Sequence, residues 1–247
     1  MAPVFLIGGG WRAGTFPETY GRFLQASTRD QVRRIAIIVA REDDEFDTRS
    51  HFLRFSSALE TAGLHPADAV EIVVAKDEPL TLEKIAGSEA TGVLVCGGLT
   101  PVYHDGLCVQ TEWLHYLNDN EIPYCGFSAG AAIAADNAIL GGWLRDIGGR
   151  FVQIADENAG EDLEQLTVRP GLGLVDFSVE VHATQWGTLS RLIHAVDADL
   201  TETGWAIDEN TMLEVNGLAA TAYGLGNAYR VTRNADGVAV AIINSPS

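Results

Sequence analysis

The segment Gly126-Phe127-Ser128-Ala129-Gly130 contains the residue types that a serine nucleophile requires. It follows an apolar run at residues 122–125 and precedes an alanine-rich stretch, which predicts a strand, a sharp turn and a helix. Glycines on both sides allow the turn to expose the Ser128 hydroxyl, and the Ala129 amide would face an oxyanion at the start of the helix. The alternative is an ordinary turn in which Ser128 only caps the helix. A cap needs neither glycine, so the pattern favours the nucleophile.

A second pair of glycines, Gly97-Gly98, directly follows the apolar run 92–96. In parallel sheets the carboxyl ends of the strands border the ligand crevice, and glycine leaves the backbone amides there open. Gly98 is therefore a candidate second oxyanion donor beside Ala129. A tight turn before a helix explains the two glycines equally well.

A serine nucleophile also needs a general base, and the chain has six histidines. Four of them lie in helical or turn segments and are expected on the surface or on a helix face: His51, His65, His115 and His194. His182 ends an apolar run, where its side chain would enter the crevice, and His104 is a reserve candidate. For the third member, Glu209 ends another short run and Asp208 stands beside it. The residues alone leave this assignment open.

The turn Gly8-Gly9-Gly10-Trp11-Arg12-Ala13 fits the spacing of a dinucleotide-binding fingerprint after a strand. The acidic residue expected about twenty positions later is missing, because the first acids of the next strand come more than thirty positions after Gly8. Pro17 also interrupts the expected helix. A loop with close backbone packing near the site is favoured, and no cofactor is predicted.

The acidic run Glu42-Asp43-Asp44-Glu45 is interpreted as a solvated loop, followed by Asp47 as a helix N-cap. Cation binding is the alternative. The chain has no HExxH motif, no pair of CxxC motifs and no EF-hand pattern, so no metal is predicted.

The chain of 247 residues has 16 basic and 34 acidic residues, a formal net charge of −18. This charge disfavours binding to nucleic acids and to anionic membrane surfaces. No apolar run is long enough to cross a bilayer, and residues 1–8 lack the basic region of a signal peptide. The odd number of cysteines, Cys96, Cys108 and Cys125, suits free thiols in a reducing compartment. We therefore predict a cytoplasmic protein.

Short apolar runs alternate with amphipathic stretches in the first half of the chain. Five runs are typical of buried strands: 4–7, 35–40, 70–75, 93–96 and 122–125. Helical spacing occurs between them at 48–62, which Gly63 ends, and at 109–117. The alternation predicts an α/β fold, with a mostly parallel sheet between helices on both faces.

The second half is less regular. Residues 141–169 are rich in glycine and acidic residues and are expected to contain loops over the sheet edge. A strand is predicted at 175–181 and a helix at 185–196. Near the C-terminus, short strands of β hairpins are predicted at 212–215, 228–231 and 238–243, separated by Asn-Gly, Gly-Asn and Asp-Gly turns. Without a linker or a repeat, residues 1–247 are predicted to form a single domain.

Three segments together resemble the dipeptidase E and cyanophycinase serine peptidases: residues 126–131, Val181-His182 and residues 204–211. The resemblance extends from the first glycine turn to about Thr211, which is most of the chain. It implies the three-layer, flavodoxin-like fold of the class I glutamine amidotransferases. It also implies a serine hydrolase that cleaves a small peptide or isopeptide amide through an acyl-enzyme.

The resemblance assigns roles to individual residues. It implies Ser128 as nucleophile, His182 as base and Glu209 as the acid that orients the base. The oxyanion hole is expected at the Gly98 and Ala129 amides. Substrate contacts are expected from Gly97, Thr100 and Trp186, in a crevice also lined by Trp11 and Tyr103.

The chain departs from the family pattern beside the site. After His182 the family usually has a phenylalanine and then arginines, whereas this chain continues Ala183-Thr184-Gln185-Trp186 and keeps only Arg191. After the second glycine pair the family usually has Asn or Asp and then Gln, whereas this chain has Leu99-Thr100-Pro101. The specificity pocket is thus expected to differ, and cleavage of cyanophycin or of Asp-X dipeptides does not follow.

The alternatives to a peptidase are a non-catalytic ligand-binding protein and an esterase or thioesterase. A homodimer is a further expectation.

Overall fold

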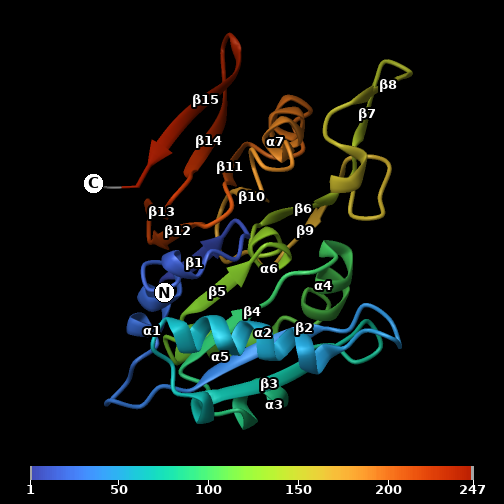
Figure 1. Cartoon of the computed structure of the whole chain (residues 1–247). Coiled ribbons are helices and arrows are strands. Elements are labelled where there is room, and N and C mark those ends of the chain that lie inside the picture. Colours follow the sequence, from blue (N-terminus) through green and yellow to red (C-terminus); the bar gives the residue numbers. More distant parts are fainter. Residues whose placement is uncertain (1, 246–247) are drawn as a thin grey trace.

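The central sheet of the computed structural model, which describes residues 2–245, has seven strands. In order across the sheet they are β13 (Ala219–Gly224), β12 (Thr211–Asn216), β1 (Val4–Ile7), β5 (Tyr124–Phe127), β4 (Gly92–Val95), β2 (Ile35–Ala40) and β3 (Ala69–Val74). From β1 to β3 all neighbours are parallel, and the β12–β13 hairpin adds an antiparallel edge (Figure 1). β1, β2, β4 and β5 are buried along their whole length, as expected for apolar runs covered on both faces.

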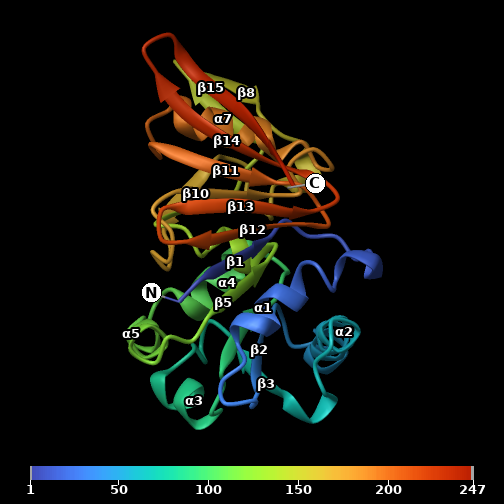
Figure 2. The same ribbon diagram turned by 90° about the vertical axis from the view of Figure 1, so that its left-hand side faces the viewer.

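Helices cover both faces of this sheet, which confirms the predicted α/β architecture. Figure 2 shows α2 (Thr48–Thr61) on one side of the sheet and α3 (Leu82–Gly87) and α5 (Glu112–Asp119) on the other. α1 (Tyr20–Ala26) contacts α2, and α4 (Thr100–Leu107) contacts β2. Right-handed crossovers explain the division, because the chain crosses the sheet in one direction from β1 to β3 and returns from β3 to β5.

A second sheet in the described chain has four strands, in the order β10 (Ser178–Val181), β11 (Thr203–Ile207), β14 (Asn227–Asn234) and β15 (Gly237–Asn244). β10 and β11 are parallel, and the remaining pairs are antiparallel. α7 (Thr188–Asp197) packs against this sheet, which lies beside the β12–β13 hairpin (Figure 2). The strand predicted at 175–181 therefore belongs to the second sheet, where it covers residues 178–181.

The loops predicted within residues 141–169 alternate with short strands. This part of the chain contains the hairpin of β7 (Leu144–Ile147) and β8 (Arg150–Gln153), a 3-10 turn at Glu157–Ala159, and β9 (Thr167–Pro170), which pairs with β6 (Asn137–Gly141). Glycines at 148 and 149 have φ of 62° and 84°, which closes the β7–β8 hairpin. Two of the glycines in this segment are thus the turn residues of a hairpin.

The predicted helix boundaries shift where a turn residue intervenes. The helix predicted at 185–196 begins at Thr188, because Gly187 has the left-handed φ of 71°. The helix predicted at 109–117 is α5, which begins at Glu112. The predicted cap of α2 is confirmed, since the Asp47 carboxylate accepts a hydrogen bond from the Ser50 amide. Two further 3-10 turns cover Ala13–Thr15 and Pro66–Asp68.

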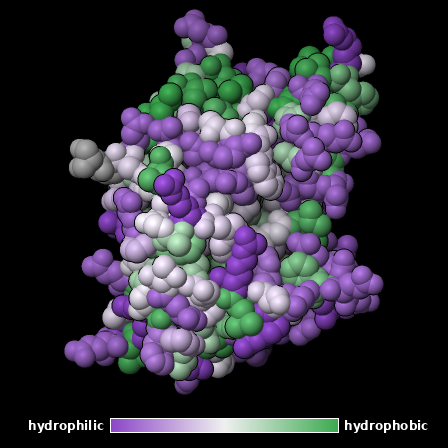
Figure 3. All heavy atoms as spheres, in the orientation of Figure 1, coloured by the Kyte–Doolittle hydropathy of each residue, from purple (hydrophilic) through white to green (hydrophobic). Residues whose placement is uncertain are grey.

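Hydrophilic side chains cover most of the face shown in Figure 3. Apolar side chains gather there over the β14–β15 hairpin and the β7–β8 hairpin, where the exposed residues are Val240, Ile242, Ile147 and Phe151. Among residues 2–245, no helix combines the length and the apolar character that a membrane span requires.

Candidate active site

Three neighbouring strands of the central sheet end at the same edge, and each leads into a glycine-containing turn. Ser128 follows β5, Gly8-Gly9-Gly10 follows β1, and Gly97-Gly98 comes shortly after β4. Because β5 lies between β1 and β4, the two glycine turns flank Ser128. In parallel sheets this carboxyl edge is where ligands bind.

Ser128 has a backbone conformation that L-residues rarely adopt, with φ of 51° and ψ of −112°. Such strain costs on the order of 1–3 kcal/mol and persists where the surrounding structure enforces it. Here close backbone packing enforces it, because a Cβ on Gly126 would collide with the carbonyl of Gly130, and one on Gly130 with that of Val95. In the described structure the Ser128 side chain makes no capping bond to α6 (Ala129–Ala132). Ser128 therefore does not serve as a side-chain cap.

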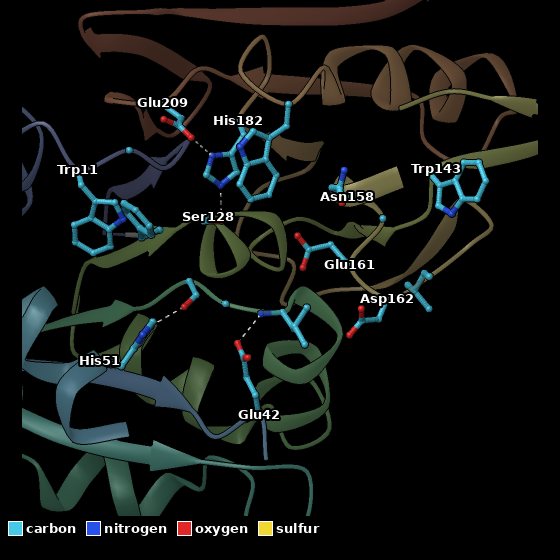
Figure 4. Close-up of a pocket in the computed structure, with 18 of the residues that line it drawn as sticks. Trp11, Glu42, His51, Ser128, Trp143, Asn158, Glu161, Asp162, His182 and Glu209 are labelled. Carbon is cyan, nitrogen blue, oxygen red and sulfur yellow. Dashed lines mark hydrogen bonds and ion pairs between the residues drawn. The ribbon is translucent and has the colours of Figure 1, made fainter. Parts of the chain in front are cut away.

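His182 and Glu209 follow neighbouring parallel strands of the second sheet. β10 and β11 pair with Val181 opposite Ile207, so the chain leaves both strands at the same edge. His182 Nε2 lies 2.9 Å from Ser128 Oγ, and His182 Nδ1 lies 2.8 Å from Glu209 Oε1 (Figure 4). Because an ionised carboxylate only accepts, Nδ1 carries the hydrogen and Nε2 is free to accept the hydroxyl proton.

The surroundings of His182 hold the imidazole in place. Burial lowers the pKa of His182, and the Glu209 carboxylate opposes this shift. The imidazole is therefore neutral at neutral pH, which is the form that a general base requires. The Trp186 ring stacks on it with centroids 4.0 Å apart and planes 8° apart. On another side Gly9 packs so closely that a Cβ there would overlap the imidazole ring.

Asp208 and Glu209 are adjacent, but their environments differ. Asp208 is buried, and its carboxylate accepts hydrogen bonds from Thr184, from the Asn227 amide and from the Tyr229 hydroxyl. The Glu209 side chain is partly exposed and contacts His182. Asp208 thus ties β11 to its surroundings, and Glu209 is the carboxylate available to the imidazole.

A cavity of about 820 Å³ opens beside Ser128. Trp11, Trp143 and Trp186 contribute to its wall, and Figure 4 shows Glu161 and Asp162 across the cavity from Trp11. Six lining residues are acidic, against the single arginine Arg54: Glu42, Glu157, Glu161, Asp162, Glu164 and Glu209. The Arg54 guanidinium lies over the Trp11 ring, 3.7 Å from its centroid. The cavity wall therefore carries a strong excess of negative charge.

Two of these carboxylates hold the turn after β4. Glu42 Oε1 accepts a hydrogen bond of 2.9 Å from the Leu99 amide, and Glu161 Oε2 accepts one of 2.8 Å from the Thr100 amide. Burial raises the pKa of Glu161, although its hydrogen bond to Thr100 and the charge of Arg191 oppose the shift. The two carboxylates come from different loops, so the turn is fixed from two sides.

The amides of Gly98 and Ala129 have no backbone carbonyl as acceptor within residues 2–245. Gly97, Gly98 and Ser128 all line the cavity. The two amides that the sequence suggests for an oxyanion hole thus have no acceptor in the backbone of the described residues.

No family model matches the chain, and no curated protein matches it. Among solved structures, a peptidase from an acI-B1 Actinobacterium is similar, with a TM-score of 0.70 at 13% sequence identity. The similarity covers 100% of this chain and 96% of that chain. The chain has the fold of that peptidase.

The remaining predicted residues lie at varying distances from the cavity. Gly97 and Trp186 line it. Thr100 is buried outside its wall, with its amide bound by Glu161, and Tyr103 is buried beneath the turn after β4. His104 Nε2 is 2.9 Å from the Pro170 carbonyl and takes no part in the Ser128 contacts.

Three residues of the cavity were not predicted from the sequence. His51 was expected on the surface, yet it is half-buried and bonded to the Gly97 carbonyl. Glu42 was expected in a solvated loop, and Glu161 in a segment with loops over the sheet edge. Their partners lie 46 to 61 residues away in the chain, so no local pattern identifies them. Among the described residues, no group of three or more His, Cys, Asp or Glu is placed to hold a metal ion.

Proposed function

We propose that the protein is a serine hydrolase that cleaves a small peptide or isopeptide amide through an acyl-enzyme on Ser128. The hydrogen-bonded series Ser128–His182–Glu209 carries this proposal, because it joins a nucleophile, a base and an orienting acid. The fold shared with a peptidase supports it. The order Ser, His, Glu along the chain agrees with the resemblance to the dipeptidase E and cyanophycinase peptidases, the family to which we assign the chain within this proposal.

In the first step the Ser128 oxygen forms a bond to the amide carbonyl carbon, and the hydroxyl proton passes to His182 Nε2. Glu209 stabilises the imidazolium that results. The carbon–nitrogen bond then breaks, and His182 gives its proton to the leaving amine. In the second step water attacks the acyl-enzyme by the same route, which releases a carboxylic acid and restores the Ser128 hydroxyl.

The carbonyl oxygen gains negative charge during both steps. The Gly98 and Ala129 amides are the donors we assign to it, because no backbone carbonyl in the described chain accepts from either of them. Each such donor contributes about 2.7–4 kcal/mol to the stability of the transition state. Placed on rigid backbone, they need no rearrangement when the charge forms.

The charge of the cavity indicates the class of substrate. Six acidic residues line it against one arginine, which already lies on Trp11. A carboxylate on the substrate would be repelled, whereas an ammonium or guanidinium group would be attracted. We therefore assign preference to amides that carry a positive charge, in contrast to the acidic substrates of dipeptidase E.

The test is a screen of peptide and isopeptide amides that differ only in charge, with products followed by mass spectrometry. Wild type should release amine from cationic members and form an acyl adduct on a peptide that contains Ser128. Ser128→Ala should lose both signals while its circular dichroism spectrum is unchanged. Cleavage of esters without amides would replace the peptidase proposal with an esterase, and turnover that survives in Ser128→Ala would contradict the mechanism.

A further inference from the structure

The carbonyl of Gly97 accepts hydrogen bonds from two different helices. His51, on α2, donates from Nε2 at 2.8 Å, and Tyr103, on α4, donates from its hydroxyl at 3.1 Å. Figure 4 shows the bond from His51 at the edge of the cavity. A carbonyl oxygen only accepts, so His51 Nε2 carries a hydrogen.

This arrangement determines where the next amide points. All peptide bonds of the described chain are trans, and in a trans unit the carbonyl and the amide point in opposite directions. With the Gly97 carbonyl held toward His51 and Tyr103, the Gly98 amide points away from both. A Cβ on Gly97 would lie 2.9 Å from the Ser128 Cβ, so this peptide passes directly beside the nucleophile.

Glycine on both sides makes the Gly97–Gly98 peptide free to rotate. A rotated unit would present its carbonyl oxygen, rather than the amide, to the developing negative charge. The two donors that prevent this are themselves rigid. The His51 ring packs between Phe46 and Phe55, with centroids 5.3 Å and 5.2 Å away, and Tyr103 is completely buried.

We propose that His51 and Tyr103 are positioning residues that fix the direction of the Gly97–Gly98 peptide and so keep the Gly98 amide available to the oxyanion. The inference rests on the proposed function, because an acyl-transfer reaction is what requires this donor. Both residues act through the peptide and touch no reacting atom.

The experiment measures the saturation kinetics of labelling by a fluorophosphonate, followed by intact mass. In this reaction the Ser128 oxygen bonds to phosphorus, fluoride leaves, the hydroxyl proton passes to His182, and the phosphoryl oxygen occupies the oxyanion hole. The limiting rate reports the transition state, and the half-saturating concentration reports binding of the probe. A residue that only shapes the cavity would change the second quantity rather than the first.

His51→Phe keeps an aromatic ring without the donor, and Tyr103→Phe removes only the hydroxyl. We expect each to lower the limiting rate about tenfold, and the double variant about 10²–10³-fold, the loss typical of one oxyanion donor. The half-saturating concentration should change less than about threefold. Tyr103→Phe, which changes a single oxygen atom, maintains the test if the ring substitution at His51 prevents folding.

Two further variants separate positioning from structure. His51→Gln retains an N–H donor at the same distance from the backbone and should recover labelling to within about threefold of wild type. His104→Phe is the matched control, because His104 Nε2 also lies 2.9 Å from a backbone carbonyl, that of Pro170, but outside the cavity wall. It should be labelled at the wild-type rate.

Wild-type rates in the double variant would overturn the inference and leave the proposed function intact. Equal losses in His51→Phe and His51→Gln would also overturn it, since the donor would then be irrelevant. Folded wild type that takes no label would overturn the proposed function, and this inference with it.

Discussion

The two halves of the candidate site are built in different ways. The edge of the central sheet contributes through its backbone: the strained turn at Ser128, the glycine turns beside it and the amides of Gly98 and Ala129. The second sheet contributes through side chains, those of His182 and Glu209. The glycine turns of the first half have no room for an added Cβ. The side chains of the second half, in contrast, can be altered by single atoms. We therefore expect substitutions in the first half to act through steric clashes, and substitutions in the second half to act through the loss of a reactive group.

Backbone hydrogen bonds join the two halves at the first glycine turn. The His182 amide donates to the Gly8 carbonyl at 2.9 Å, and the Asn210 amide donates to the Gly9 carbonyl at 2.7 Å. The turn after β1 thus connects the sheet that carries Ser128 to the sheet that carries His182. Close packing explains its glycines, because a Cβ on Gly9 would overlap the His182 ring and one on Gly10 would collide with Asn210.

The largest effect on kcat is expected from a substitution in the second half of the site, at Glu209. Glu209→Gln should lower kcat by about 10⁴-fold, because the amide cannot stabilise the imidazolium and favours the wrong tautomer of His182. Its thermal unfolding midpoint should stay near that of wild type, since the Glu209 side chain is partly exposed.

The neighbouring carboxylate is the matched control. Asp208→Asn should lower the free energy of unfolding by about 1–3 kcal/mol, because an amide cannot accept from all the donors around this buried site. The kcat per folded molecule should change little. Thermal unfolding and active-site titration together check both variants, and an exchange of the two effects would refute the distinction between Asp208 and Glu209.

A smaller loss of kcat is expected when one methyl group is added to the first half of the site, at Gly9. Gly9→Ala places a Cβ within the space of the His182 ring, and its φ of 102° is unfavourable to alanine. Displacing the imidazole should lower kcat by about 100-fold. Gly14→Ala adds the same atom at a position with nothing within 4 Å and should leave activity unchanged. Steady-state kinetics on both variants test this prediction, and equal activities of the two variants would contradict it.

The pH dependence of the reaction should report the ionisation of His182. Burial lowers the pKa of its imidazole, so the neutral base persists into more acidic solution. The rate constant kcat/KM should be constant at neutral pH and fall only below about pH 6.5, the ordinary pKa of histidine. Glu209→Gln removes a charge that raises this pKa, so the acid limb should move to still lower pH. A limb above pH 7 in wild type would contradict the buried neutral base.

The smallest effect concerns the charge of the cavity. Glu161→Gln removes one negative charge but keeps an oxygen for the Thr100 amide. The KM of a cationic substrate should rise about fivefold, equivalent to about 1 kcal/mol, and that of a neutral substrate should not change. Parallel titrations of the two substrates test this, and an equal rise in both would indicate a displaced turn instead.

The first half of the site could be predicted from sequence because its signals are local. Strands buried on both faces are continuous apolar runs, and a glycine pair or a G-x-S-x-G segment identifies the turn that follows. His182 and Glu209 required the family resemblance, since nothing in the local sequence shows that β10 and β11 are adjacent and parallel. Their roles remain part of the proposal.

What could not be predicted depends on contacts between distant segments. His51 is an ordinary helical histidine until α2 is packed beside the turn after β4. Glu42 and Glu161 become cavity residues through single hydrogen bonds to the backbone amides of that turn. The cytoplasmic location, the homodimer and the single domain remain predictions.

The proposed mechanism requires that His182 activates Ser128. Intact-mass analysis after fluorophosphonate treatment tests it directly, with wild type compared with Ser128→Ala and His182→Ala, each shown to be folded by circular dichroism. We expect one adduct per wild-type molecule, mapped to Ser128, and none on either variant in the same time. Equal labelling of His182→Ala, or an adduct on another residue that persists in Ser128→Ala, would contradict it.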